Sequence, residues 1–198
     1  MNSLKPNTIP LPSFDPRLMR KLLLLCCHFA RNVAYYRIGY VNENGTGELK
    51  QATQLGATIN GNMLDIAVLE WCKLFADRNA RHSWRRIVRT DEEQSQFLTH
   101  LSRNVGVSTN DWKRYLDVMR VYRDKFVAHL DEENVMNIPN LETALRGVFF
   151  LYQYMVARTP DGILNMPHRS ILPSDLSSYY VECESEARVS YGPQKVAK

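Results

Sequence analysis

Residues Ser108–Glu133, STNDWKRYLDVMRVYRDKFVAHLDEE, give the clearest indication of fold class, because their apolar side chains recur at the spacing of a long amphipathic helix. Ser108 and Asp111 are placed as an N-terminal cap. At about 100° per residue, a wide apolar face gathers around Met119. Its other members are Trp112, Tyr115, Leu116, Tyr122, Phe126 and Leu130. The pattern predicts a helix that begins at Ser108 and continues to about Asp131.

Four further helical patterns accompany this one, and strand patterns are few. Asp15 and Pro16 place a cap and a first-turn proline before the first helix, and Thr90 and Glu93 make a capping box before the third. The expected ranges are about 16–40, 61–77, 91–105, 108–131 and 141–158. The sequence therefore predicts an all-α fold, an up-and-down helical bundle of about five helices.

Residues 159–198 differ in composition from the rest of the chain, because they carry four prolines and many serines and acidic residues. We therefore expect a helical domain over residues 1–158 and an irregular C-terminal extension over residues 159–198. Tyr179, Tyr180 and Val181 are the side chains expected to anchor this extension, either to the body of the domain or to a partner subunit.

The composition is that of an ordinary globular protein, with 44% apolar residues and a formal net charge of +4. No apolar run approaches the roughly 20 residues that a membrane span needs, and no secretion signal is apparent. We expect a soluble, cytoplasmic protein with no membrane partner. The four cysteines and most of the histidines lack the spacing of metal ligands, and there is no Gly-rich phosphate loop. We expect neither a metal nor a cofactor.

Arg123 lies inside the apolar face of the predicted helix, about 40° from Met119, and His129 lies at the other margin, about 80° from Met119. An arginine that faces a core is costly unless carboxylates, carbonyls or a bound anion accept from its donors. One explanation is a buried ion pair with Asp65 or Glu70. The other is a cleft in which Arg123 and His129 contact a phosphate. A straight helix would separate them by about 9 Å and 120°, so this cleft would need a bend or a second copy across a two-fold axis.

The segment RDKFVAHLD, residues 123–131, combines an arginine, a polar residue and a histidine six residues after the arginine, late in a helix of a small bundle. It resembles the motif of the HEPN superfamily (higher eukaryotes and prokaryotes nucleotide-binding domains), and especially that of its abortive-infection and toxin branch. LDIAVLEWCKLF, residues 64–75, and HSWRRIV, residues 82–88, look similar to the same branch. The resemblance covers about residues 16–158.

This resemblance implies a metal-independent endoribonuclease that acts as a homodimer, with two motifs facing each other across a composite cleft. His129 would be the acid/base on the ribose 2′-hydroxyl, and Arg123 would stabilise the charge that develops on the scissile phosphate. Asp124 matches the polar residue that orients the motif, and Lys125 is a candidate phosphate contact. Tyr122 is a supporting residue beside them.

A second candidate region is the basic segment RNARHSWRRIVR, residues 78–89. Basic residues with an interleaved aromatic suit a single RNA strand, which needs phosphate neutralisation and a stacking surface. The candidate RNA-binding residues are Arg81, Arg85, Arg86 and Arg89. The alternative is a group of cations at a helix C-terminus, with Trp84 packed inside.

The leading hypothesis is a HEPN-type endoribonuclease of a toxin–antitoxin or phage-defence system, which cleaves RNA by attack of the 2′-hydroxyl. Its expected partners are RNA, a second copy of the chain and an antitoxin protein. One alternative is a HEPN module that binds RNA or a protein partner without catalysis. Another is a helical bundle in which Arg123 only forms a structural ion pair.

Overall fold

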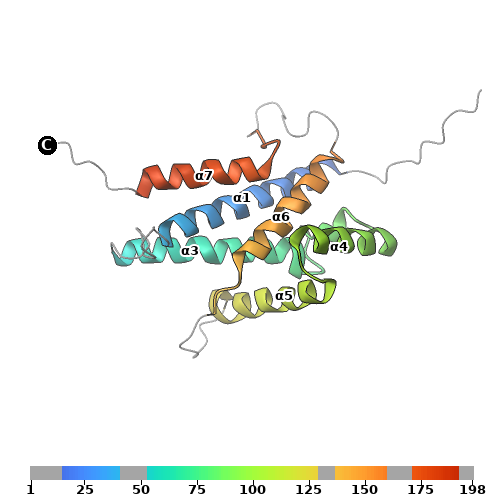
Figure 1. Ribbon diagram of the computed structural model, residues 1–198, viewed down its shortest axis with the longest axis horizontal. Helices are drawn as coiled ribbons and strands as arrows, with labels where there is room; N and C mark the ends of the chain where they lie inside the picture. Colours follow the sequence, from blue (N-terminus) through green and yellow to red (C-terminus); the bar gives the residue numbers. More distant parts are fainter. Residues whose placement is uncertain (1–14, 41–52, 129–136, 160–170, 192–198) are drawn as a thin grey trace, which may run out of the picture.

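The computed structural model describes residues 15–40, 53–128, 137–159 and 171–191, and over these ranges it contains six α-helices and no strands (Figure 1). The helices are α1 (Pro16–Tyr40), α3 (Gln54–Trp71), α4 (Asp91–Val105), α5 (Thr109–Tyr122), α6 (Leu141–Val156) and α7 (Leu176–Tyr191). Three short turns accompany them, the π-helical turns η1 (Cys72–Ala76) and η3 (Arg123–Ala128) and the 3-10 turn η2 (Trp84–Arg86). The predicted all-α helical bundle is confirmed.

The caps predicted before α4 and α5 are both present. Thr90 and Glu93 form the reciprocal capping box, with side-chain to backbone hydrogen bonds of 3.2 Å in both directions. Ser108 accepts a hydrogen bond from the backbone N–H of Asp111 at 3.1 Å. Between these caps, Gly106 ends α4 with a positive φ of 79°, which costs glycine least. Local sequence therefore defines this helix–turn–helix segment.

Two helix boundaries differ from the predicted ones. α3 begins at Gln54 rather than near residue 61, because the side chain of Thr53 accepts a hydrogen bond from the backbone N–H of Gly56 at 3.0 Å. The α-helical part of α5 ends at Tyr122, and the chain continues as a π-helical turn to Ala128. The remainder of the predicted helix, to Asp131, lies outside the described residues.

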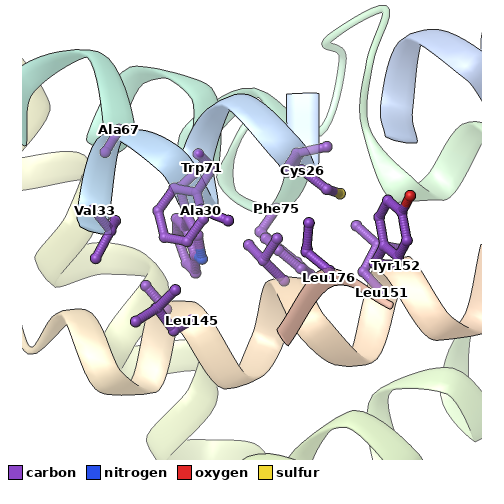
Figure 2. Close-up of a cluster of buried hydrophobic side chains, with 14 of the residues drawn as sticks. Cys26, Ala30, Val33, Ala67, Trp71, Phe75, Leu145, Leu151, Tyr152 and Leu176 are labelled. Carbon is purple, nitrogen blue, oxygen red and sulfur yellow. The ribbon is translucent and has the colours of Figure 1, made fainter. Parts of the chain in front are cut away.

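Trp71 lies at the centre of the buried core (Figure 2). Its ring centroid is 5.1 Å from that of Phe75, 5.7 Å from that of Trp112 and 5.4 Å from that of Tyr115. α6 approaches this aromatic group at Gly147, where a Cβ would lie 2.8 Å from Cη2 of Trp112. The core is therefore packed tightly enough that only glycine fits at that position of α6 without movement of the indole.

The expectation of an irregular extension is wrong for residues 176–191, which form α7 and lie along α1 (Figure 1). The hydroxyl of Tyr35 donates to Oε2 of Glu186 at 2.6 Å, and Nη1 of Arg37 donates to the hydroxyl oxygen of Tyr180 at 3.3 Å. Tyr180 is buried, as expected of an anchor, whereas Val181 is 57% exposed and does not anchor the segment.

The buried side chains of α7 are Leu176, Tyr180, Cys183 and Ala187. They recur at intervals of four, three and four residues, which is the spacing of one helix face. This spacing is present in the sequence, but the serine, proline and acidic residues around it favour the prediction of an irregular segment.

Within the described ranges, every helix is too short or too polar to span a bilayer.

Candidate functional site

Arg123 lies where α5 passes into η3, and its side chain is 20% exposed. Nη1 donates to Oδ1 of Asp77 at 2.5 Å, and Nε donates to Oδ1 of Asp124 at 2.8 Å. These bonds, that to Asp124 foremost, raise the pKa of Arg123 above its usual value although burial opposes them. Among the described residues, Nη2 has no hydrogen-bond partner. Two carboxylates thus orient the guanidinium of a side chain that is 20% exposed.

The carboxylate of Asp77 takes the place that the sequence suggested for Asp65 or Glu70. Asp65 instead accepts a hydrogen bond from the hydroxyl of Tyr122 at 3.3 Å. Glu70 lies with an oxygen 3.4 Å from Nδ1 of His28. The expectation of an ion pair is therefore correct for Arg123, but both of its suggested partners are wrong.

Asp77 lies at the end of η1, where the backbone departs from α-helical geometry. The backbone N–H of Asp77 donates to the carbonyl of Cys72 at 2.9 Å, which is the i→i+5 bond of a π-helix. Beside it, Nε of Arg120 donates to the carbonyl of Ala76 at 3.1 Å. The end of η1 is therefore held by two arginines of the α5–η3 segment. π-helical turns occur frequently at functional sites.

His129 lies outside the described residues, so the pairing of Arg123 with His129 stays a prediction. The residues between them occupy η3, which is π-helical over Arg123–Ala128. A separation calculated for a straight α-helix does not apply to such a turn, because the backbone bonds change from i→i+4 to i→i+5.

The three supporting residues have different surroundings. Tyr122 is buried, and burial, followed by the charge of Asp65 and the hydrogen bond to it, raises the pKa of its hydroxyl. It therefore supports the site from within the core. The exposed carboxylate of Asp124 accepts a hydrogen bond from Nε of Arg123 at 2.8 Å, and its role in orienting the motif stays a prediction. Lys125 is half-buried and takes part in an interaction of its own.

Within the basic segment of residues 78–89, the aromatic side chain is turned inward. Trp84 is 1% exposed, and its ring stacks on that of Phe97 with 4.4 Å between centroids and 16° between planes. A nucleobase therefore has no access to the indole face. The alternative interpretation of Trp84 as a packed core residue is confirmed, although the segment forms turns and η2 rather than a helix C-terminus.

The predicted RNA-binding arginines of this segment are not equivalent. Arg86 donates to the carbonyls of Ala80 and Asn79 at 3.4 and 3.2 Å and so stabilises its own turn. Arg81 and Arg89 are exposed, and Arg89 makes an interaction of its own. These three side chains lie at the surface, where phosphates could reach them.

Arg85 packs on Trp84 of its own segment and interacts electrostatically with Arg120 of α5. Its guanidinium carbon lies 4.5 Å from the ring centroid of Trp84, and Nη1 is buried without a hydrogen-bond partner among the described residues. Burial, followed by the charges of Arg78 and Arg120, lowers the pKa of Arg85. Arg120 also binds the end of η1, next to Asp77. Arg85 of the basic segment therefore lies close enough to Arg120 of α5 for their charges to interact, which spacing along the sequence did not indicate.

The four cysteines are buried and free. Among the residues that the structure describes, no group of three or more His, Cys, Asp or Glu side chains is arranged to hold a metal ion.

Comparisons of the chain with models of known protein families, with curated proteins and with solved structures found no match.

Proposed function

We propose that the chain is a metal-independent endoribonuclease of the HEPN type that acts in the cytoplasm as part of a toxin–antitoxin or phage-defence system. One observation carries the proposal. The guanidinium of Arg123 is oriented by Asp77 and Asp124, its Nη2 has no hydrogen-bond partner among the described residues, and Asp77 directly precedes the basic segment of residues 78–89. This is the arrangement that a phosphate backbone entering the site would need.

The reaction follows from the two side chains of the motif. His129 removes the proton of the ribose 2′-hydroxyl, and the 2′-oxygen attacks the adjacent phosphorus. The bond from phosphorus to the 5′-oxygen breaks, and that oxygen takes up a proton. Arg123 stabilises the negative charge on the phosphoryl oxygens during this step. The products are a 2′,3′-cyclic phosphate and a free 5′-hydroxyl, and DNA is inert because it lacks the attacking hydroxyl.

A homodimer is part of the proposal. Val118 and Val121 of α5 are 49% and 52% exposed and lie three residues apart, on one face of the helix. An exposed apolar pair on α5 favours contact with a second copy, and a dimer of two facing motifs is what the resemblance implies. RNA and an antitoxin protein are the other proposed partners.

A second function is favoured by one observation on the same residue. Because Asp77 and Asp124 already neutralise Arg123, its attraction for a phosphate is weaker than that of an unpaired arginine. This favours a HEPN module without catalysis, in which Arg123 is a structural residue and RNA or a protein partner is bound by other residues. The two proposals differ in whether the motif cleaves RNA.

The test incubates purified protein with mixed RNA in the presence of EDTA. Wild type should cut RNA to 2′,3′-cyclic phosphate ends and leave DNA intact. His129→Ala should lose about 10²–10⁴-fold in rate, whereas His100→Ala, which changes an exposed histidine of α4, should cut normally. Arg123→Lys should be inactive, because the ammonium group of lysine cannot replace the two parallel donors of a planar guanidinium. Arg114→Lys should cut RNA normally.

Circular dichroism would establish that each variant is folded. RNA left intact by wild type across substrates would refute the ribonuclease and favour the binding module. Cutting by folded His129→Ala at the wild-type rate would have the same consequence, and cutting that stops with EDTA would refute the metal-independent reaction.

A further inference from the structure

A hollow of about 280 Å³ lies between α1 and the η1–η2 segment. Its lining consists of Lys21, Leu24, Leu25, His28, Lys73 and His82. It contains neither Arg123 nor Asp77, so it is separate from the proposed ribonuclease site. The volume is close to the roughly 300 Å³ at the lower end of ligand pockets.

Two lysines and two histidines line the hollow. Among the described residues, no carboxylate forms a salt bridge or hydrogen bond with Lys21, Lys73 or His82. Burial, and then the charges of Lys21, Arg81 and Lys73, lower the pKa of His82. These cations are therefore close enough to His82 to disfavour its protonation, which a bound anion would relieve.

The nearest acidic group compensates poorly for this charge. An oxygen of Glu70 lies 3.4 Å from Nδ1 of His28, but the Glu70 side chain is buried behind the histidine. Burial raises the pKa of Glu70 to about 7, although Asn32, Lys73 and Arg31 act in the opposite direction. Burial, followed by the charge of Arg31, lowers the pKa of His28. Near neutral pH the hollow therefore holds two lysine charges and only a partial acidic charge.

The wall of the hollow is apolar. Leu24 and Leu25 are partly buried and expose their remaining surface to it, while the two lysines lie exposed at its rim. A sugar–phosphate backbone alone would leave this apolar surface uncovered. A ligand with an apolar body and one anionic head would satisfy both the wall and the rim.

We propose that the hollow between α1 and η1 binds a small organic anion, whose apolar body packs on Leu24 and Leu25 and whose phosphate or carboxylate head lies between Lys21 and Lys73. His28 and His82 donate to the same head when they are protonated. This site goes beyond the proposed ribonuclease and does not depend on it.

The test follows the histidine ring signals of the full chain by NMR, with phenyl phosphate, benzoate, inorganic phosphate and phenol as probes. His28→Gln and His82→Gln assign the two signals. Phenyl phosphate and benzoate should shift both signals saturably in the millimolar range, and inorganic phosphate and phenol should bind more weakly. The double change Lys21→Ala with Lys73→Ala should weaken binding about tenfold, whereas Lys113→Ala, on exposed α5 surface, should not.

The pH series uses benzoate, whose charge is constant between pH 7.5 and 5.5. Its binding should strengthen as the pH falls, because Glu70, whose pKa burial raises to about 7, loses its charge over this range. Absence of saturable shifts overturns the proposal, as does equal binding by the double lysine variant. Equal binding of phenol would show an apolar site only, and equal binding of inorganic phosphate would show a phosphate contact that does not use the apolar wall. Either result would also overturn it.

Discussion

Arg123 and Asp77 join the ends of two π-helical turns, with 2.5 Å between Nη1 of the arginine and Oδ1 of the aspartate. This contact accounts for an arginine on the core-facing side of α5, because the carboxylate and the partial exposure together satisfy the guanidinium. It also holds the guanidinium in one orientation. The same contact can therefore be a structural ion pair or the support of a phosphate-binding arginine, and the two roles predict different behaviour.

Asp77→Asn separates these roles, because asparagine keeps an acceptor oxygen but loses the charge. If Asp77 positions Arg123 for catalysis, RNA cleavage should fall about 10–100-fold through misplacement of the guanidinium. RNA affinity should not fall, because a negative charge has been removed. Cleavage rates and filter binding measure the two effects. Asp111→Asn, which alters the partner of Arg114 on α5, is the matched control. Unchanged cleavage would assign the pair to structure alone.

Val121→Asp should convert the proposed dimer into a monomer. Val121 is half exposed on α5, and burying a carboxylate there at a dimer contact would be costly. Sedimentation velocity at micromolar concentration measures the effect, and RNA cleavage should fall with it if two motifs form one cleft. Val189→Asp introduces the same charge on α7 at a side chain that is 83% exposed, and it should leave the dimer intact. A monomeric wild type would contradict the dimer outright.

Arg85→Ala with Arg86→Ala should flatten the salt dependence of RNA binding. Each lost phosphate contact reduces the slope of log affinity against log salt by about one unit. Arg86→Ala should also cost about 1 kcal/mol of stability, because it removes hydrogen bonds to the carbonyls of Ala80 and Asn79. Arg103→Ala, at an exposed position of α4, controls for net charge. If the slope is the same in both variants, the segment does not contact the RNA backbone.

Gly147→Ala should destabilise the fold by about 1–3 kcal/mol, because the new methyl group would lie 2.8 Å from Cη2 of Trp112. Gly61→Ala on α3 is the matched control, since nothing lies within 4 Å of its added Cβ. That change should stabilise the helix by about 0.5–1 kcal/mol. Urea denaturation of both variants gives the comparison. Equal effects of the two alanines would indicate that α6 and Trp112 are less tightly packed than the structure indicates.

In the wild type, the free energy of unfolding should fall as the pH rises from about 4.5 to 7. Glu70→Gln should remove this fall. Burial raises the pKa of Glu70 to about 7, so over this range the folded chain keeps a proton that the unfolded chain releases. The stability that protonated Glu70 gives to the folded chain is fully present below the pKa of the unfolded chain, and it is lost as the pH rises through about 7. The two proteins should thus agree near pH 4.5, and the glutamine variant should be the more stable at pH 8.

The measurement is urea denaturation as a function of pH, taken as the difference between variant and wild type. The difference is needed because His28, whose pKa is lowered, changes stability in the opposite direction. Glu182→Gln, at an exposed position of α7, should follow the wild type. A difference that does not depend on pH would mean that Glu70 titrates normally.

The sequence indicated most of this fold through local signals. Asp15 and Pro16, the Thr90–Glu93 capping box and Ser108 each lie at a helix start, because a cap needs only residues within one turn. α7 was missed although Tyr180 and its neighbours have helical spacing. Its apolar stripe is narrow, and it is stabilised by packing on α1 and by contacts such as Tyr35 with Glu186, which are distant in sequence.

By itself, the sequence determined the all-α class, the main helix starts and the presence of an arginine that needed a partner, since periodicity and capping are local properties. Only the tertiary structure decided that this partner is Asp77, that Trp84 stacks inside on Phe97, and that Arg85 lies near α5. The reason is that η1 and η3 depart from α-helical geometry, so a helical wheel misplaces the side chains that follow. Contacts between helices depend on how their faces meet in three dimensions, which periodicity along one helix does not specify.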